Sequence, residues 1–261
     1  MIRRATAALE PLPRRMLVRV WGHPRIQTRQ KWKALWPYLA SIPRRPIRLL
    51  DAGCGDGLWS LELATRRPEW LITGVDRAEA SVETAERARQ RLGLRNLTFV
   101  QRDFLSFHPP DAFDIVLSVA SAHYLVEEGR GQDLFRAFRA WLKPNGWLLL
   151  FAPRCGREVP RVHWLPAPFH LRDVISLEAM QSLCRSAGLE IEVLAPVIGT
   201  LGTLANQVAR AAGTSRILVP LSYPLRVALS GLDVIHGSAE LQRASSAWVL
   251  LARHAVEAER S

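Results

Sequence analysis

Short apolar runs alternate with helical patterns through the middle of the chain. The apolar runs predict buried strands over residues 48–51, 70–76, 96–101, 113–119 and 147–151. Between them, the three- and four-residue spacing of apolar positions predicts helices over 58–67, 78–92 and 132–142. Strands that alternate with helices in this way indicate a parallel sheet that helices cover on both faces.

The regular alternation ends near residue 152. Residues 152–175 are rich in proline and predict a long loop, and long loops inside compact domains tend to be functional. A helix over 177–187, a strand over 189–194 and a last strand over 246–253 follow. Residues 196–245 form an insert with few charges before that last strand.

The net charge of +11 belongs to the N-terminal part of the chain. Residues 1–50 hold twelve Arg and Lys against one acid, Glu10, whereas the rest of the chain holds 23 of each kind. We therefore divide the chain into a basic N-terminal arm, residues 1–46, and a neutral domain, residues 47–261. The neutral body and the lack of a recognisable nucleic-acid module disfavour a nucleic-acid partner.

Compartment and metal content follow from a few simple features. We find neither an uninterrupted apolar stretch long enough to span a membrane nor the apolar core of a signal peptide. Cys54, Cys155 and Cys184 lie far apart without a C-x-x-C pair, which is typical of a reducing compartment. We expect a cytoplasmic protein without a bound metal.

The candidate chemistry begins in LLDAGCGDG, residues 49–57. Gly53, Gly55 and Gly57 lie between a strand and a helix, where glycine lets the backbone turn sharply and lets a ligand approach. The start of the helix adds free N–H groups that favour an anionic group. The dinucleotide fingerprint G-x-G-x-x-G would need a further glycine where this chain has Leu58.

Acidic residues extend this site along the ends of the strands. Asp51 precedes the turn, and its carboxylate suits a cationic amino-acid ligand better than a pyrophosphate. Asp76 ends the second strand, where a carboxylate can accept hydrogen bonds from both hydroxyls of a ribose. Asp103 follows the third strand beside Phe104, so an acceptor for an exocyclic amine stands next to an aromatic face.

Five markers in order resemble the class I S-adenosylmethionine-dependent methyltransferases: LLDAGCGDG, GVD (74–76), RDF (102–104), FDIVLSVASAHYL (113–125) and LKPNGWLLL (142–150). The resemblance implies an α/β fold, a Rossmann-like doubly wound sheet of seven mostly parallel strands with an antiparallel last strand. It implies S-adenosyl-L-methionine as cofactor and S-adenosyl-L-homocysteine as product. The cofactor-binding residues that it implies are Asp51, Gly53, Gly55, Gly57, Asp76, Arg77, Asp103, Phe104 and Ser118.

The segment after the fourth strand should face the methyl acceptor. His123 is the candidate base or orienting group, with Tyr124 beside it, and the alternative is a packing role in the cofactor wall. A base is needed only where the acceptor must lose a proton, as a hydroxyl does. Methyltransferases that act on adenine or glutamine resemble one another in an N/D-P-P-Y/F motif here. This chain has SVAS at 118–121, which disfavours that substrate class.

The proline-rich loop supplies the candidate substrate residues Arg154, Arg157, His163 and Trp164. They could close over an anionic or aromatic acceptor, and the alternative is that the arginines are simply solvated.

Two further segments bear on the partner. The arm combines its basic residues with Trp21, Trp32 and Trp36, and the insert contains an apolar stretch, 217–235, that prolines and charges interrupt. Such segments suit a lipid-like acceptor and a peripheral position at an anionic membrane surface, the inner membrane face. The insert could equally be a helical lid or a dimer face, which leaves a homodimer open.

We therefore expect a methyltransferase that moves a methyl group to a small-molecule or lipid-like acceptor, at oxygen. Two alternatives stay open: an RNA-directed methyltransferase that uses the basic arm, and a non-catalytic scaffold that binds the cofactor. The predicted architecture adds a helical N-terminal arm and a helical insert, residues 196–245, to the seven-stranded domain.

Overall fold

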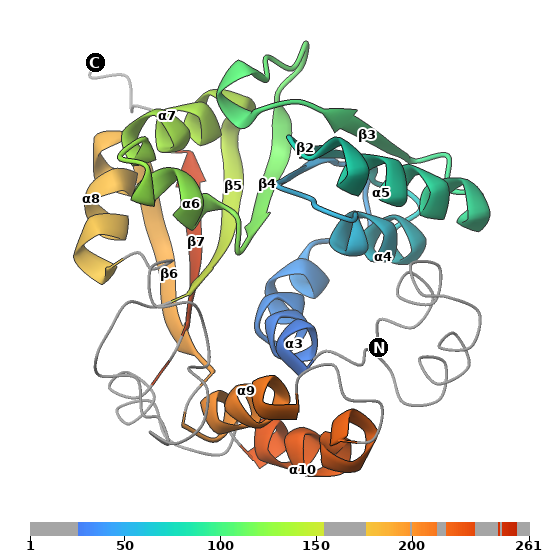
Figure 1. The fold of residues 1–261 in the computed structure, drawn as a ribbon. Coiled ribbons are helices and arrows are strands. Elements are labelled where there is room, and N and C mark those ends of the chain that lie inside the picture. The colour runs from blue at the N-terminus through green and yellow to red at the C-terminus, as the bar shows by residue number, and fades with distance from the viewer. Residues whose placement is uncertain are drawn as a thin grey trace.

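The computed structural model describes residues 26–153, 176–198, 200–212, 218–232, 245 and 247–254. In this part of the chain seven strands form one sheet, in the order β3-β2-β1-β4-β5-β7-β6 (Figure 1). The strands are β1 (Arg48–Ala52), β2 (Leu71–Asp76), β3 (Leu97–Gln101), β4 (Phe113–Val119), β5 (Leu142–Pro153), β6 (Leu189–Val197) and β7 (Ala247–His254). β7 runs antiparallel to both of its neighbours, and the pairs among β1 to β5 are parallel. The predicted fold class is confirmed.

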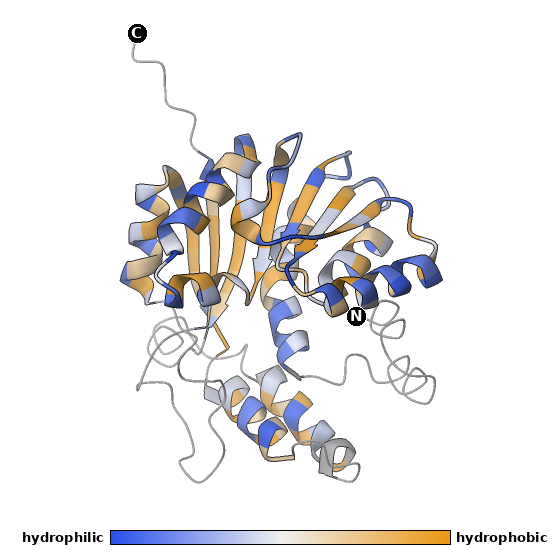
Figure 2. Ribbon diagram, turned by 45° about the horizontal axis from the view of Figure 1, so that its top comes forward, coloured by the Kyte–Doolittle hydropathy of each residue, from blue (hydrophilic) through white to orange (hydrophobic). Residues whose placement is uncertain are grey.

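Helices cover both faces of the sheet, and each face has its own core. One core includes side chains of α3 (Ile26–Ser41), α4 (Leu58–Arg66) and α5 (Glu79–Leu92). The other includes side chains of α6 (Ala122–Glu127), α7 (Gly131–Trp141) and α8 (Leu177–Ser186). Neighbouring strand residues such as Leu49 and Leu50 belong to opposite cores, because side chains alternate along a strand. Figure 2 shows the strands as the most apolar part of the molecule.

The insert forms two helices, α9 (Thr200–Ala212) and α10 (Leu218–Leu232), as expected. Both follow the carboxyl end of β6, and α3 lies between the sheet and this pair (Figure 1). Hydrogen bonds join α3 to the pair. Gln30 Nε2 donates to the carbonyl of Gly202 at 2.9 Å, and Arg29 Nη1 donates to the hydroxyl of Tyr223 at 3.0 Å.

The end of the predicted basic arm packs into the same core as the sheet. Trp32 is 2% exposed, and its ring stacks on Trp36 and on Trp59 of α4, with centroids 5.0 and 4.9 Å apart. Leu35 and Leu39, one and two turns further along α3, are fully buried. Trp32 is therefore a core residue and is not available to a membrane surface. The rest of the arm, residues 1–25, lies outside the described residues.

β5 and β6 differ most from the predicted bounds, whereas β1, β2, β3 and β7 differ by one residue at one or both ends. β5 begins at Leu142, the last residue of the predicted helix 132–142, and a bulge opposite Phe113 and Ile115 takes up the extra residues before the predicted start at 147. β6 continues past Leu194 to Val197 and includes Pro196, which an edge strand tolerates since one side of it needs no partner. None of the described helices is long and apolar enough to cross a membrane.

Candidate cofactor and acceptor site

The glycine turn is tied to the neighbouring strand β2. The N–H groups of Gly53 and Cys54 both donate to the carbonyl of Val75, at 2.8 and 3.0 Å. Gly53, Gly55 and Gly57 have φ of +82°, +52° and +76°, a left-handed conformation that only glycine adopts without strain. The run of glycines is therefore what lets the chain turn from β1 into α4 at this point.

The turn is packed on one side and open at its tip. A Cβ at Gly53 would overlap the side chain of Ser121 and lie 2.8 Å from Cζ of Phe104. A Cβ at Gly55 would meet no atom within 4 Å. The backbone at Gly55 is thus free to be approached by another molecule, as a cofactor cradle requires.

Asp76 lies beside this open tip. Its Oδ2 accepts a hydrogen bond from the N–H of Gly55 at 2.8 Å, and its Oδ1 accepts one from the N–H of Ala78 at 2.9 Å. These bonds fix the carboxylate, and each oxygen keeps a further lone pair for a hydroxyl donor. Arg77 is exposed, and its carbonyl accepts a bond from the amide of Gln101 at 3.2 Å.

Asp103 and Phe104 form the next part of the rim. Asp103 Oδ1 accepts a hydrogen bond from the N–H of Leu105 at 3.0 Å and so caps the short 3₁₀ turn Phe104–Ser106. The cap holds the ring of Phe104 against Gly53, half-buried. The structure therefore brings this aromatic face to the glycine turn, close to where the sequence placed it.

Asp51 lies beneath the turn, 1% exposed. It accepts a 2.6 Å hydrogen bond from Ser60 Oγ, which joins β1 to α4. Burial raises the pKa of Asp51 to about 7, the Ser60 bond opposes this shift, and the charge of Asp76 adds to it. Its predicted contact with the amine of the cofactor stays a prediction.

Ser118 is fully buried and bonds to a residue that the sequence reasoning missed. Ser121 Oγ donates to the carbonyl of Ala52 at 2.8 Å, so the 2.7 Å bond between the two serines is donated by Ser118. Ser121 also fills the space that a side chain at Gly53 would need. No motif marks this role, because it arises only where the ends of β1 and β4 meet.

His123 and Tyr124 lie in the first turn of α6, just after the carboxyl end of β4. Their ring centroids are 4.1 Å apart. His123 is 4% exposed and Tyr124 is 49% exposed, so the phenol is the more accessible of the two. Their predicted catalytic role stays a prediction. The predicted substrate residues Arg154, Arg157, His163 and Trp164 lie outside the described residues.

Lys31 reaches the same end of the strands from α3 and was counted only as part of the basic arm. Its Nζ lies 5.5 Å from the centroid of the Phe151 ring, near the end of β5. The Phe151 carbonyl accepts a hydrogen bond from the N–H of Ala120 at 2.9 Å, just before Ser121. Burial lowers the pKa of Lys31 to about 8. Only the packing of α3 reveals this position.

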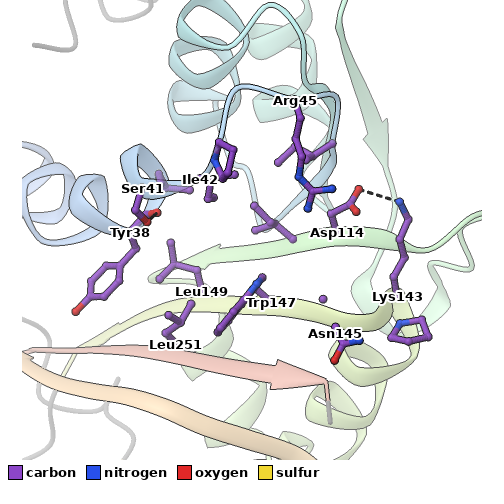
Figure 3. A pocket seen from close by; sticks show the side chains of 16 residues that line it. Tyr38, Ser41, Ile42, Arg45, Asp114, Lys143, Asn145, Trp147, Leu149 and Leu251 are labelled. Atoms are coloured by element: carbon purple, nitrogen blue, oxygen red, sulfur yellow. Dashed lines mark hydrogen bonds and ion pairs between the residues drawn. The ribbon is translucent and has the colours of Figure 1, made fainter. Parts of the chain in front are cut away.

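A cavity of about 540 Å³ lies at the opposite ends of the strands, where β4 and β5 begin (Figure 3). Its wall includes the first residues of β4 and β5, where Asp114 accepts bonds from the Arg48 N–H at 2.8 Å and from Lys143 Nζ at 2.9 Å. Burial alone would raise the pKa of Asp114, but these two donors outweigh it and lower the pKa. The cavity is separate from the glycine turn, which follows the carboxyl end of β1.

The strand order, the antiparallel β7 and the glycine turn after β1 together define the class I methyltransferase fold. Residues 49–146 match a family model described as "Methyltransferase domain". This part of the chain is therefore a methyltransferase domain of the class I, S-adenosylmethionine-dependent type, as the sequence motifs predicted.

Curated relatives share this domain over part of their length. The release factor glutamine methyltransferase of Escherichia coli (strain K12) is 38% identical over 80 residues, which cover 31% of this chain and 29% of that protein. The 27-O-demethylrifamycin SV methyltransferase of Amycolatopsis mediterranei (strain S699) is 32% identical over 152 residues, 56% of this chain and 54% of that protein. The matched part thus spans about half or less of these relatives.

A solved structure extends the likeness to most of the fold. The geranyl diphosphate C-methyltransferase of Streptomyces coelicolor A3(2), in complex with Mg²⁺, geranyl diphosphate and S-adenosyl-L-homocysteine, matches with a TM-score of 0.59. The match covers 88% of this chain and 81% of that one at 16% sequence identity. At this identity the likeness concerns the fold.

Proposed function

We propose that this protein transfers the methyl group of S-adenosylmethionine to an oxygen atom of a small-molecule or lipid-like acceptor. The observation that carries the proposal is the glycine turn, whose tip at Gly55 is open and lies beside the fixed carboxylate of Asp76. The residues around this space fit the cofactor: a carboxylate for ribose hydroxyls, an aromatic ring for adenine and a bare backbone for the methionine part. The cofactor supplies an electrophilic methyl group on a sulfonium sulfur.

The protein then has mainly to orient the acceptor and exclude water. Asp76 would hold the ribose, and Asp103 with Phe104 would frame the adenine. α9 and α10 follow the carboxyl end of β6, at the ends of the strands where ligands of such sheets bind, and the start of α3 contacts both helices (Figure 1). They are therefore the elements that would cover the acceptor.

Two observations support oxygen as the accepting atom. SVAS at 118–121 replaces the motif of the adenine and glutamine enzymes. In addition, the relative named 27-O-demethylrifamycin SV methyltransferase matches a longer part of the chain than the release factor glutamine methyltransferase does. A hydroxyl acceptor must lose a proton, and His123 with Tyr124 supplies groups that could take it up.

A titration followed by a transfer screen tests this proposal. We expect the full chain to bind both S-adenosylmethionine and S-adenosylhomocysteine in a calorimeter. We then expect it to release S-adenosylhomocysteine with hydroxyl compounds or lipids, and not with amines or RNA. Failure to bind either nucleoside rejects the proposal. Transfer to RNA alone favours the RNA-directed alternative, and binding without any transfer favours the scaffold.

We also propose that the enzyme works at an anionic membrane surface, because α10 presents an apolar stripe outward. Leu221 and Leu225, one turn apart, are 74% and 54% exposed, and Pro224 and Ala228 on the same face are exposed too. Arg226, in contrast, is 3% exposed. α10 contacts the start of α3 through Tyr223, next to the segment that carries the excess positive charge.

Flotation with vesicles tests the membrane contact. We expect the chain to float with vesicles that contain phosphatidylserine and not with pure phosphatidylcholine vesicles. The double variant Leu221→Ser/Leu225→Ser should lose most of this binding, since it removes the exposed apolar side chains. An unchanged flotation rejects the role of α10. A concentration-dependent dimer that the double variant abolishes would assign the stripe to a second copy instead.

A further inference from the structure

Two buried carboxamides, Gln30 of α3 and Asn206 of α9, lie on helices that contact each other. Gln30 Nε2 donates to the carbonyl of Gly202. In an α-helix this carbonyl is directed at the N–H of the residue four positions later, which is Asn206. Gly202 and Asn206 also share one face of α9. The amide of Gln30 therefore lies against the turn of α9 that carries Asn206.

Both carboxamides are buried with polar atoms that have no hydrogen-bond partner. Asn206 is 0% exposed, and within the described part of the chain neither its Nδ2 nor its Oδ1 has a partner. Gln30 is 6% exposed, and its Oε1 has none either. The assignment of the Gln30 amide is secure, because a flipped amide would place its oxygen against the Gly202 carbonyl. Buried polar groups are normally bonded, so these three atoms on two contacting helices need a partner from outside the described residues.

The contact lies at the edge of the sheet that carries the candidate site. The ammonium group of Lys31, the residue after Gln30, lies over the ring of Phe151. The carbonyl of Phe151 accepts a hydrogen bond from the N–H of Ala120. The next residue, Ser121, fills the space above Gly53. α9 follows the carboxyl end of β6, which ends on the same side as β5. Contacts thus lead from the glycine turn to Lys31, the residue after Gln30 in α3, and Gln30 in turn bonds to α9.

We propose that Gln30 and Asn206 bind the methyl acceptor and select a neutral group that both donates and accepts hydrogen bonds, a hydroxyl or a carboxamide. This inference rests on the proposed function, since it concerns the acceptor of that reaction. The unpartnered atoms are one NH₂ donor and two carbonyl acceptors. A hydroxyl donates to Oε1 or Oδ1 and accepts from Nδ2, whereas a carboxylate or an ether offers only lone pairs to the two amide oxygens.

The test compares matched probes on the full chain saturated with S-adenosylhomocysteine. Ligand-observed NMR measures the binding of benzyl alcohol, benzyl methyl ether and benzoate, and of other short alcohols with their ethers and carboxylates. We expect the wild type to bind the alcohols at least about fivefold more tightly than their ethers or carboxylates. The variant Asn206→Leu, which keeps the side chain's size, should lose this preference. Gln132→Leu, an exposed amide on α7, is the control and should keep it.

Thermal unfolding separates recognition from a structural role. Leucine removes two buried polar atoms that have no partner in the protein, so Asn206→Leu should unfold at the same or a higher temperature than the wild type. A lower unfolding temperature would show that the protein itself needs the amide and would overturn the inference. So would an unchanged alcohol preference in the variant, or no preference in the wild type. Calorimetry with S-adenosylhomocysteine keeps the two proposals apart, because its failure concerns the proposed function alone.

Discussion

The hydroxyl of Ser121 donates a 2.8 Å hydrogen bond to the carbonyl of Ala52 and thereby ties the loop after β4 to the end of β1. β1 and β4 are neighbours at the centre of the sheet. The strand after β1, β2, lies on one side of this pair, and the strand after β4, β5, lies on the other, so the strand order reverses between them. In open α/β sheets the ligand site lies at such a point. The bond therefore joins the glycine turn to the residues proposed to act on the acceptor.

The open tip of the turn gives the sharpest test of cofactor binding. Gly55 and Gly93 both have positive φ, +52° and +65°, and a Cβ at either position would meet no atom within 4 Å. Gly55→Ala and Gly93→Ala should therefore cost a similar free energy of unfolding, about 1–2 kcal/mol. Only Gly55→Ala places a methyl group in the proposed cofactor space, so it alone should weaken S-adenosylmethionine binding, by at least about tenfold.

Calorimetry on both variants checks this expectation, with chemical denaturation as the measure of stability. Equal affinities for S-adenosylmethionine in the two variants would place the cofactor somewhere other than over Gly55.

The buried carboxyl of Asp51 should make stability depend on pH. Its pKa is raised from 3.8 to about 7 by burial, so between pH 4 and 7 the folded state binds more protons than the unfolded state. The free energy of unfolding should therefore fall as the pH rises through this window, by up to about 4 kcal/mol. Asp51→Asn keeps the shape and an acceptor for Ser60, and it should remove this slope.

Urea unfolding at pH 4.5, 6 and 8 measures the effect. Asp133→Asn, which removes an exposed carboxylate on α7, is the control for the loss of one negative charge. A wild type and an Asp51→Asn variant with parallel pH profiles would show that Asp51 is ionised throughout.

The base proposed for transfer to oxygen can be removed directly. His123→Gln and His123→Ala should each lower turnover by about 10²- to 10⁴-fold, because the acceptor hydroxyl would lose its proton acceptor. Affinity for S-adenosylhomocysteine should stay within about threefold of the wild type, since the cofactor residues are untouched. Tyr124→Phe tests whether the accessible phenol takes part. Unchanged turnover in both His123 variants ends the general-base hypothesis and leaves His123, 4% exposed, as a packing residue.

The sequence predicted the bounds of an element correctly where its apolar run matches the residues that are buried. β4 was predicted with its observed ends, because an apolar run that is buried on both faces is bounded by turn residues. The positions of the glycine turn, Asp76 and Phe104 were also predictable, since these residues lie at or just after the ends of strands, and their roles toward the cofactor stay predictions. The length of β5 was not, because a bulge in its pairing with β4 is a property of two strands together.

The residues of α3 and α9 near the proposed acceptor site were harder to predict, because their surroundings also depend on segments far apart in the chain. Gln30, Lys31 and Trp32 lie in a segment whose positive charge dominates its pattern, so they were interpreted as parts of a basic arm. Their roles depend on contacts across long stretches of chain, such as that between Gln30 and Gly202, 172 positions apart. A carboxamide such as Asn206 looks like an ordinary polar residue until its burial is known.

The packing of α3 predicts that the arm cannot be removed up to residue 46 without loss of the fold. Trp32 is stacked between Trp36 and Trp59, and the guanidinium of Arg66 lies 5.4 Å from its ring. Trp32→Ala should cost about 3–5 kcal/mol, because it leaves a large cavity under α4. Trp36→Ala should cost less, since that ring is only partly buried. Chemical denaturation measures both, and circular dichroism of a chain that starts at residue 47 should show no cooperative unfolding. A truncated chain that unfolds cooperatively and binds S-adenosylhomocysteine would instead establish residues 47–261 as an independent domain.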